Sequence, residues 1–366
     1  MTPEAAPTQR LIDFHVALVE GGVGLTTVGQ CNVSADARNL DNEMYFHEGI
    51  RAGLCKLTQA VHAHGGKISA QFTHCGYFKL NKPLESDRVL SPSFIFNKGG
   101  APYGRPFAYA MTLADIDKTV QDYVRSAVMA QETGFDAIEL MMCHGYLINQ
   151  FMSSNINKRK DEYGGSLENR TRLAVRIVRE IRAAVGKDFP LLAKINLDDA
   201  CEGGLKIEDA VQIAKILEAA GIDALVTSAG RSPGNTGFMF RGDSPIPFMI
   251  KQLQSPFMKL FLKLFGKYQF SYIPYEELYL LDMARQIRKA VKCNVVYLAG
   301  VSSVQGMETC MREGFDFVAV GRALINDPQM VNRIAADPGY KNGCTHCNQC
   351  IALIYDPNGV RCVLND

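Results

Sequence analysis

The stretch that decides the fold runs from Phe135 to Arg172 and reads FDAIELMMCHGYLINQFMSSNINKRKDEYGGSLENRTR. It begins with a short apolar run, AIELMM, which is typical of a buried strand. At His144-Gly145-Tyr146 the run breaks into a long polar segment, which enters a helix at Ser166. Enzymes on α/β scaffolds carry their catalytic groups on the loops that follow strands. This stretch therefore predicts an active-site loop on an α/β fold.

The order helix, glycine, aspartate and apolar strand occurs in three places, at residues 132–138, 220–226 and 313–319. A glycine at the end of a helix supplies a left-handed cap. The apolar run that follows suits a parallel strand covered on both faces. Repetition of these units predicts a wound α/β fold.

The number of units distinguishes an open sheet from a barrel. The expected strands are Val23–Val28, Lys67–Phe72, Asp136–Met141, Pro190–Asn196, Asp223–Ser228, Asn294–Ala299 and Asp316–Val320. The expected helices between them are Glu43–His64, Ala114–Thr133, Asn169–Val185, Ile207–Ala220, Tyr275–Ala290 and Ser303–Arg312. Seven strands with helical crossovers are one fewer than a (β/α)8 barrel contains.

Composition is that of a globular protein with a large core. The 366 residues are 47% hydrophobic and 21% charged, with a net charge of +1. A balanced charge gives no reason to expect a nucleic-acid partner. No apolar stretch reaches the roughly 18 residues that span a bilayer, and no secretory signal is visible at the N-terminus. These features, together with cysteines that read as reduced thiols, predict a cytoplasmic protein.

HGYLINQF, followed by NINKRKDEYGGSLENRTR, resembles the signature region of the Old Yellow Enzyme family of FMN-dependent oxidoreductases, and its 2,4-dienoyl-CoA reductase-like branch in particular. The similarity extends from about Gly21 to the end of the chain. It implies a TIM (β/α)8 barrel that binds FMN, uses NAD(P)H as reductant and reduces an activated C=C bond. Family members begin with a strand that this sequence lacks, so the expected fold is the barrel without its first strand. Either the sequence starts late or the barrel closes imperfectly.

The resemblance implies a catalytic role for two residues of the loop. Tyr146 matches the family's proton donor, and its phenol, with an unperturbed pKa of about 10, is protonated at neutral pH. His144 matches a residue that holds the substrate carbonyl oxygen. The family's second donor position carries Met141, which cannot donate a hydrogen bond. The structural alternatives are a tyrosine packed under the loop and a histidine that only ends the strand.

Two strand-end residues match flavin contacts of the family. Gln71 resembles the glutamine that hydrogen-bonds the flavin pyrimidine, since an amide serves both donor and acceptor edges. Lys194 matches a cation that stabilises the reduced flavin. A cation within an apolar strand requires a partner. The structural alternative pairs Lys194 with Asp198 or Asp199.

Gly300 and Gly321 follow the last two strands, where barrels commonly bind phosphate. Arg322 can add a forked contact to that phosphate. The resemblance places the FMN phosphate here. A tight turn between strand and helix would also favour glycine.

The C-terminal pattern is Cys344-x2-Cys347-x2-Cys350-x11-Cys362. Four thiolates suit a [4Fe–4S] cluster or a Zn site, and free thiols are the remaining interpretation. The resembling reductases carry a cluster on a frame with one more residue between the second and third cysteines. His346 is an additional candidate ligand.

The predicted domain organisation is a barrel over residues 1–343 and a Cys-rich tail over residues 344–366. Insertions at residues 78–109 and 230–275 are expected to lie over the barrel mouth as lids. The second contains lysines alternating with Phe and Leu at helical spacing, which also suits a membrane-surface or partner-binding helix pair.

The predicted activity is FMN-dependent reduction of an enone or enoyl substrate by hydride from flavin N5 and a proton from Tyr146. An iron–sulfur dehydrogenase or demethylase and a non-catalytic truncated barrel are the alternatives. The expected partners are a small-molecule substrate, a separate redox protein if a cluster forms, and further copies of the chain at exposed sheet edges.

Overall fold

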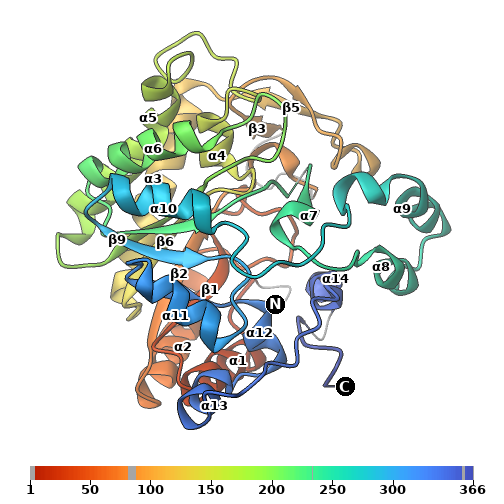
Figure 1. The fold of residues 1–366 in the computed structure, drawn as a ribbon. Coiled ribbons are helices and arrows are strands. Elements are labelled where there is room, and N and C mark those ends of the chain that lie inside the picture. Colours follow the sequence, from red (N-terminus) through yellow and green to blue (C-terminus); the bar gives the residue numbers. More distant parts are fainter. Residues whose placement is uncertain (1–4, 81–87, 233, 357–358, 366) are drawn as a thin grey trace.

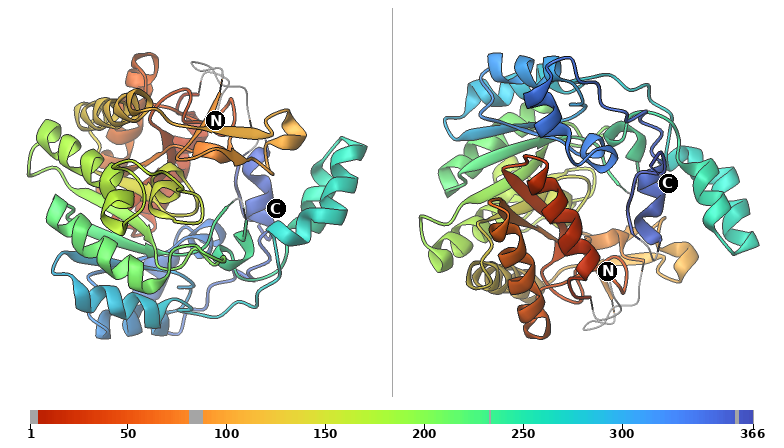
Figure 2. Two further views of the ribbon diagram at one scale, coloured as in Figure 1. Left: turned by 90° about the horizontal axis from the view of Figure 1, so that it is seen from above. Right: turned by 90° about the horizontal axis from the view of Figure 1, so that it is seen from below.

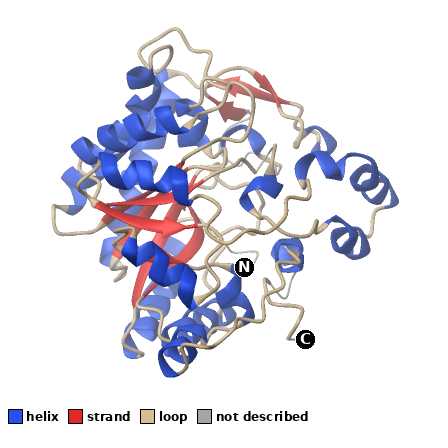
Figure 3. Cartoon of the chain, in the orientation of Figure 1, coloured by secondary structure: helices blue, strands red, loops and turns tan. Residues whose placement is uncertain are grey.

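The computed structural model describes residues 5–80, 88–232, 234–356 and 359–365. Seven parallel strands form a curled sheet with helices around it (Figures 1 and 3). In sheet order the strands are β1 (Leu25–Asn32), β2 (Lys67–Thr73), β6 (Ala137–Met142), β7 (Leu191–Asn196), β8 (Ala224–Ser228), β9 (Asn294–Leu298) and β10 (Phe317–Ala319). All seven strands expected from the sequence are confirmed, and the fold is of the TIM-barrel type.

The crossover helices cover the outside of the sheet. They are α2 (Arg51–Ala63), α3 (Leu113–Glu132), α5 (Leu167–Val185), α6 (Ile207–Ala220), α10 (Leu281–Ala290) and α11 (Val304–Arg312). The main hydrophobic core lies between these helices and the sheet. A smaller apolar cluster of Ala224, Val226 and Val296 lines the inside of the barrel.

The helices α2 and α10 begin later than the sequence pattern predicted. Residues ahead of α2 are extended, because Tyr45 forms a parallel bridge with Asn32 and the Phe46 N–H donates to the Asn32 carbonyl. A short 3₁₀ turn, Glu48–Ile50, then leads into α2. Pairing with the end of β1 has therefore overridden helix propensity at residues 43–47.

Within the described residues β1 and β10 do not pair with each other, so the sheet is open along one seam. Helices close the ring there instead. The end of α1 (Gln9–Glu20) contacts α13 (Met330–Ala336), where the Asn332 side chain donates to the Glu20 carbonyl at 2.7 Å and the Asn332 N–H donates to the Gly21 carbonyl. The expected imperfect closure is seen in the described part of the chain.

The three repeated aspartates fasten the beginnings of neighbouring strands. Asp136 accepts a hydrogen bond from the Ile68 N–H at 2.9 Å, at the start of β2. Asp223 and Asp316 accept equivalent bonds, each of 2.8 Å, at the starts of β7 and β9. A basic side chain also pairs with each aspartate, as Lys67 does with Asp136. The repeated aspartates therefore help to set the register between neighbouring strands.

Two insertions lie at the carboxyl ends of the strands. The first forms a small sheet of β3 (Val89–Ser91), β5 (Phe107–Ala110) and β4 (Ile95–Phe96), and its residues 81–87 lie outside the described residues. The second contains α7 (Thr236–Met239), α8 (Ile246–Gln252) and α9 (Pro256–Gln269). Helices α8 and α9 stand away from the barrel in both views of Figure 2.

Three shorter helices complete the chain: α4 (Leu147–Met152), α12 (Arg322–Asn326) and α14 (Gln349–Ala352). Short 3₁₀ turns occur at Gly76–Phe78, Ala101–Tyr103 and Leu353–Tyr355. No helix among the described residues has the length and apolar character needed to cross a membrane.

Candidate active site

A sharp turn after β6 presents the two predicted catalytic residues. His144 has φ +58° and Gly145 has φ +80°, so two consecutive residues are left-handed. Tyr146 returns to extended backbone and caps α4. Histidine in the left-handed region is uncommon and persists only where its surroundings impose it.

A buried polar network imposes this turn. Asp199, which is fully buried, accepts hydrogen bonds from Asn149, Ser153 and Asn196 at 3.1, 2.7 and 2.8 Å. The other amide atoms of the network hold the turn, because Asn149 Oδ1 accepts from the Gly145 N–H at 2.8 Å and Asn196 Oδ1 accepts from the His144 N–H. The loop after β7 thus positions the loop after β6.

The His144 ring contacts β8. Its Nε2 lies 2.6 Å from Ser228 Oγ. Burial lowers the pKa of His144 to about 3, and the Lys194 cation adds to the decrease. The imidazole is therefore neutral at neutral pH, and it has one N–H to donate.

Tyr146 packs at the edge of an apolar cluster below the first insertion. Its ring meets Phe78 edge to face, with centroids 5.1 Å apart. The cluster also contains Tyr77, Ile95 and Ile156. Tyr146 itself is partly buried, so its ring packs against this cluster while part of the side chain stays accessible to solvent.

Gln71 and Lys194 meet at a shared carboxylate on the strand between them. Glu139 Oε1 accepts from Gln71 Nε2 at 2.5 Å and lies 2.8 Å from Lys194 Nζ. Glu139, not Asp198 or Asp199, is thus the partner of the buried cation. Register explains the meeting, since Gln71 is opposite Glu139, and Lys194 is opposite Met141, two residues further along β6. The sequence signal for Glu139 was a single acid in an apolar strand.

The predicted phosphate residues lie on the other side of the barrel mouth. Gly300 has φ +65°, and its carbonyl accepts from the Tyr275 hydroxyl at 2.8 Å. Gly321 faces open space, since a Cβ built there would meet no atom within 4 Å. Arg322 donates to the Arg241 carbonyl and to Asn348 Oδ1, which directs its guanidinium toward the C-terminal tail. The phosphate role of these three residues stays a prediction.

The four cysteines of the tail line one small cavity together with Arg322. Burial raises the pKa of Cys350 to about 11, against the influence of the Arg322 cation. Within the described residues no three His, Cys, Asp or Glu side chains have an arrangement that would hold a metal ion. His346 stacks on Tyr275 instead, with centroids 3.3 Å apart. The four thiols gather at one cavity, and the cluster and the Zn site stay predictions.

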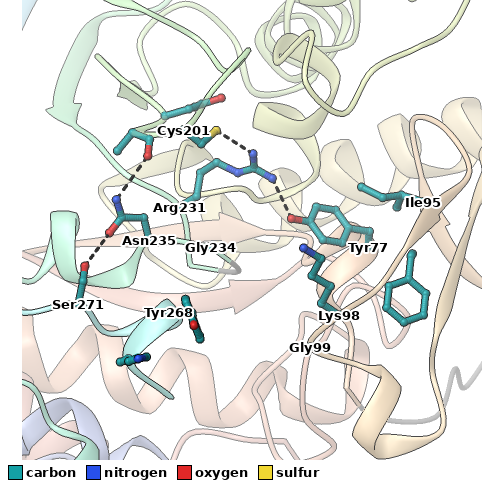
Figure 4. A pocket seen from close by; sticks show the side chains of 14 residues that line it. Tyr77, Ile95, Lys98, Gly99, Cys201, Arg231, Gly234, Asn235, Tyr268 and Ser271 are labelled. Atoms are coloured by element: carbon teal, nitrogen blue, oxygen red, sulfur yellow. Dashed lines mark hydrogen bonds between the residues drawn. The ribbon is translucent and has the colours of Figure 1, made fainter. Parts of the chain in front are cut away.

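A larger cavity of about 470 Å³ is lined by residues from the loops after β2, β7 and β8 (Figure 4), and neither His144 nor Tyr146 is among the residues that line it. Arg231 crosses its wall: Nη2 donates to the Tyr77 hydroxyl at 2.8 Å, and Nη1 lies 3.2 Å from Cys201 Sγ. The Arg231 backbone bridges to His144, and its buried Nε has no hydrogen-bond partner. Lys98 and Lys267 line the same cavity, so three cations face it. Sequence reasoning missed Arg231, because a single arginine in a loop carries no local signal.

This fold and this site define a class: barrel oxidoreductases that hold a flavin at the carboxyl ends of their strands. The chain belongs to the NADH:flavin oxidoreductase / NADH oxidase family, whose model matches residues 2–232. Enzymes of this family, which includes the Old Yellow Enzymes, are FMN-dependent oxidoreductases that use NAD(P)H. The predicted family and enzyme class are confirmed.

Relatives match along the whole chain. It is 37% identical over 365 residues to the 4,4'-dithiodibutanoate disulfide reductase of Rhodococcus erythropolis, covering 100% of this chain and 89% of the relative. It is 32% identical to the NADH oxidase of Thermoanaerobacter brockii and 28% identical to the cinnamate reductase of Clostridium sporogenes. The chain spans about half the length of these two, 51% and 52%.

Solved structures support the fold. A 2-naphthoyl-CoA reductase complex aligns with a TM-score of 0.81 at 23% identity, over 99% of this chain and 52% of that one. Morphinone reductase in complex with tetrahydroNAD aligns with a TM-score of 0.70 at 21% identity, over 94% of this chain and 85% of that one.

The residues present suit FMN at the β2–β6–β7 end of the site. A flavin pyrimidine needs an amide and a cation beside it. Gln71 and Lys194 supply both, and Glu139, on the strand between theirs, contacts each of them.

Proposed function

We propose that this protein is an ene-reductase that transfers hydride from NAD(P)H, through FMN, to an alkene conjugated to a carbonyl group. Bound FMN would supply the hydride chemistry. The observation that carries the proposal is the left-handed turn, in which a neutral imidazole and a phenol lie two residues apart. A carbonyl acceptor and a carbon that gains charge need these two donors.

In this mechanism His144 donates its N–H to the substrate carbonyl oxygen and stabilises the negative charge that develops there. Tyr146 gives its proton to the α-carbon. Gln71 and Lys194 hold the pyrimidine end of the flavin. The network around Asp199 keeps the two donors in place.

We further propose that the substrate carries an anionic group. Arg231, Lys98 and Lys267 line the cavity, and Arg231 Nε lacks an acceptor. A carboxylate would satisfy that donor. Two relatives act on carboxylates, 4,4'-dithiodibutanoate and cinnamate.

The Tyr146→Phe variant tests the proton donor. Anaerobic stopped-flow absorbance would follow flavin reduction by NAD(P)H and reoxidation by cinnamate in separate experiments. Reoxidation should slow by about 10²- to 10⁴-fold, which is the usual contribution of a general acid. Flavin reduction should keep its rate, since that step needs no phenol. Equal slowing of both half-reactions would contradict the proposal.

Disulfide reduction is a second candidate, favoured by the 37% identity to a disulfide reductase across the full chain. That reaction consumes NAD(P)H and one proton per disulfide and yields two thiols. No carbon is protonated, so Tyr146→Phe should leave the rate of thiol release from 4,4'-dithiodibutanoate nearly unchanged. The two substrates assayed on one variant thus separate the candidates.

A further inference from the structure

Apart from Lys267 and Tyr268, which line the cavity, the surface of helix α9 takes no part in the proposed reaction. At helical spacing its side chains fall into parallel rows: Lys259, Lys263 and Lys267; beside them Leu260, Leu264 and Tyr268; then Phe257, Phe261 and Phe265. Five of the apolar side chains are more than half exposed: Phe257 66%, Leu260 56%, Leu264 55%, Phe265 51% and Tyr268 70%. Tyr268 also lines the cavity, and the expected lid over the barrel mouth stays a prediction.

The opposite face of α9 is the one that packs. Gly266 is buried against Ile246 of α8, where an added Cβ would come within 2.8 Å of Ile246 Cδ1. The helix pair α8–α9 is attached at its base by a β-bridge between Gly242 and Ile273 and by the buried side chain of Phe270. The exposed rows therefore belong to a helix fixed in orientation, which projects beyond the barrel (Figure 1).

The charge of this segment indicates which kind of partner its exposed surface can bind. Residues 244–275 contain four lysines and no aspartate or glutamate. A second copy would bring like charges together, which disfavours self-association through this face. A surface that attracts lysines and also takes up Phe and Leu side chains is a bilayer with anionic lipid. At 14 residues, or about 21 Å, α9 is too short to cross a hydrocarbon core of about 30 Å.

We propose that α8 and α9 form an interfacial anchor that binds the surface of an anionic bilayer, with α9 lying in the plane of the headgroups. The Phe and Leu rows enter the acyl boundary, and the lysine row contacts lipid phosphates. The same face surrounds the substrate cavity, because Lys267 and Tyr268 line it from α9, and Ile95 and Phe96 line it from β4. Phe94, at 63% exposure, extends the apolar rim on that side.

Vesicle flotation of the full chain tests the anchor. The probes are vesicles of equal parts phosphatidylcholine and phosphatidylglycerol, and vesicles of phosphatidylcholine alone. The chain should float with the anionic vesicles, and binding should fall at about 1 M salt, where the screening length is only about 3 Å. Binding to phosphatidylcholine alone should be weaker by about tenfold or more.

Two double variants separate the electrostatic from the apolar contribution to vesicle binding. Lys259→Glu/Lys263→Glu should lose at least about tenfold in partitioning to anionic vesicles. Leu260→Ser/Leu264→Ser should lose a similar factor in both vesicle types. Neither pair lines the cavity, so flavin binding and turnover of a water-soluble substrate should be unchanged.

Matched controls use exposed residues elsewhere. Lys187→Glu/Lys215→Glu makes the same charge change and should leave flotation intact. Failure of the wild-type chain to float with either vesicle would overturn the anchor, as would equal flotation of wild type and both α9 variants. Retention by an acidic protein without vesicle binding would assign the face to a protein partner and would also overturn it. None of these outcomes depends on ene-reduction.

Discussion

Single buried histidines show how the interior sets the chemistry of side chains. Burial lowers the pKa of His74 to about 3, with further decreases from Lys79 and Lys118. Its Nδ1 accepts the Gly76 N–H at 3.0 Å, which requires the neutral ring. His144 has the same low pKa. Neutral imidazoles therefore follow the carboxyl ends of β2 and β6.

A pH prediction follows for His74. Between its ordinary value of 6.5 and about 3 the unfolded chain binds a proton that the folded chain does not. The free energy of unfolding should therefore fall as pH decreases through this window, by up to about 1.4 kcal/mol per pH unit for this group. Urea denaturation of His74→Gln at several pH values should show a shallower dependence than wild type. The exposed-site variant His64→Gln provides the comparison, and an unchanged slope in His74→Gln would contradict the burial argument.

Single residues also show where sequence reasoning stops. The family resemblance identified Gln71 and Lys194 as flavin contacts, and in the structure both side chains contact Glu139. Glu139 was missed because its pairing depends on the register between strands, which no local pattern states. Arg231 reaches the cavity from a loop after another strand. The cysteine spacing predicted that the four thiols gather, but it carries no information on how their sulfurs are directed.

At the scale of elements, the glycine–aspartate repeat predicted strands correctly for a reason that the sequence did not reveal. Each aspartate ties its own strand to the first residues of a neighbour. Helix starts were predicted less well, since the chain ahead of α2 follows β1. Local patterns thus located the strands, while tertiary pairing moved the helix boundaries.

Replacing one of these aspartates should cost stability without affecting the site. Asp136→Ala removes the acceptor for the Ile68 N–H and the partners of Lys67 and His62. Leaving the N–H of buried Ile68 without this acceptor should lower the free energy of unfolding by about 2 kcal/mol. Chemical denaturation measures the change, and Asp188→Ala, at an exposed turn, is the control. A similar loss in both variants would show that the strand tie contributes nothing.

The whole molecule is a ring held shut by helices along one side. Strands β6, β7 and β8 have neighbours on both edges, whereas β1 and β10 have one each within the described residues. Hydrogen exchange followed by mass spectrometry should therefore show faster exchange in peptides from β1 and β10 than in those from β6 to β8. Equal protection at high protein concentration, lost on dilution, would indicate that another copy covers the seam.

The contact between Glu20 and Asn332 has a consequence for biosynthesis. The two residues are separated by 312 positions. During translation the segment around Glu20 leaves the ribosome long before the segment around Asn332, so the helices that close this seam meet late. Ring closure is then a late event with a long loop to order. We expect a nascent chain of this kind to bind a chaperone that covers exposed strand edges.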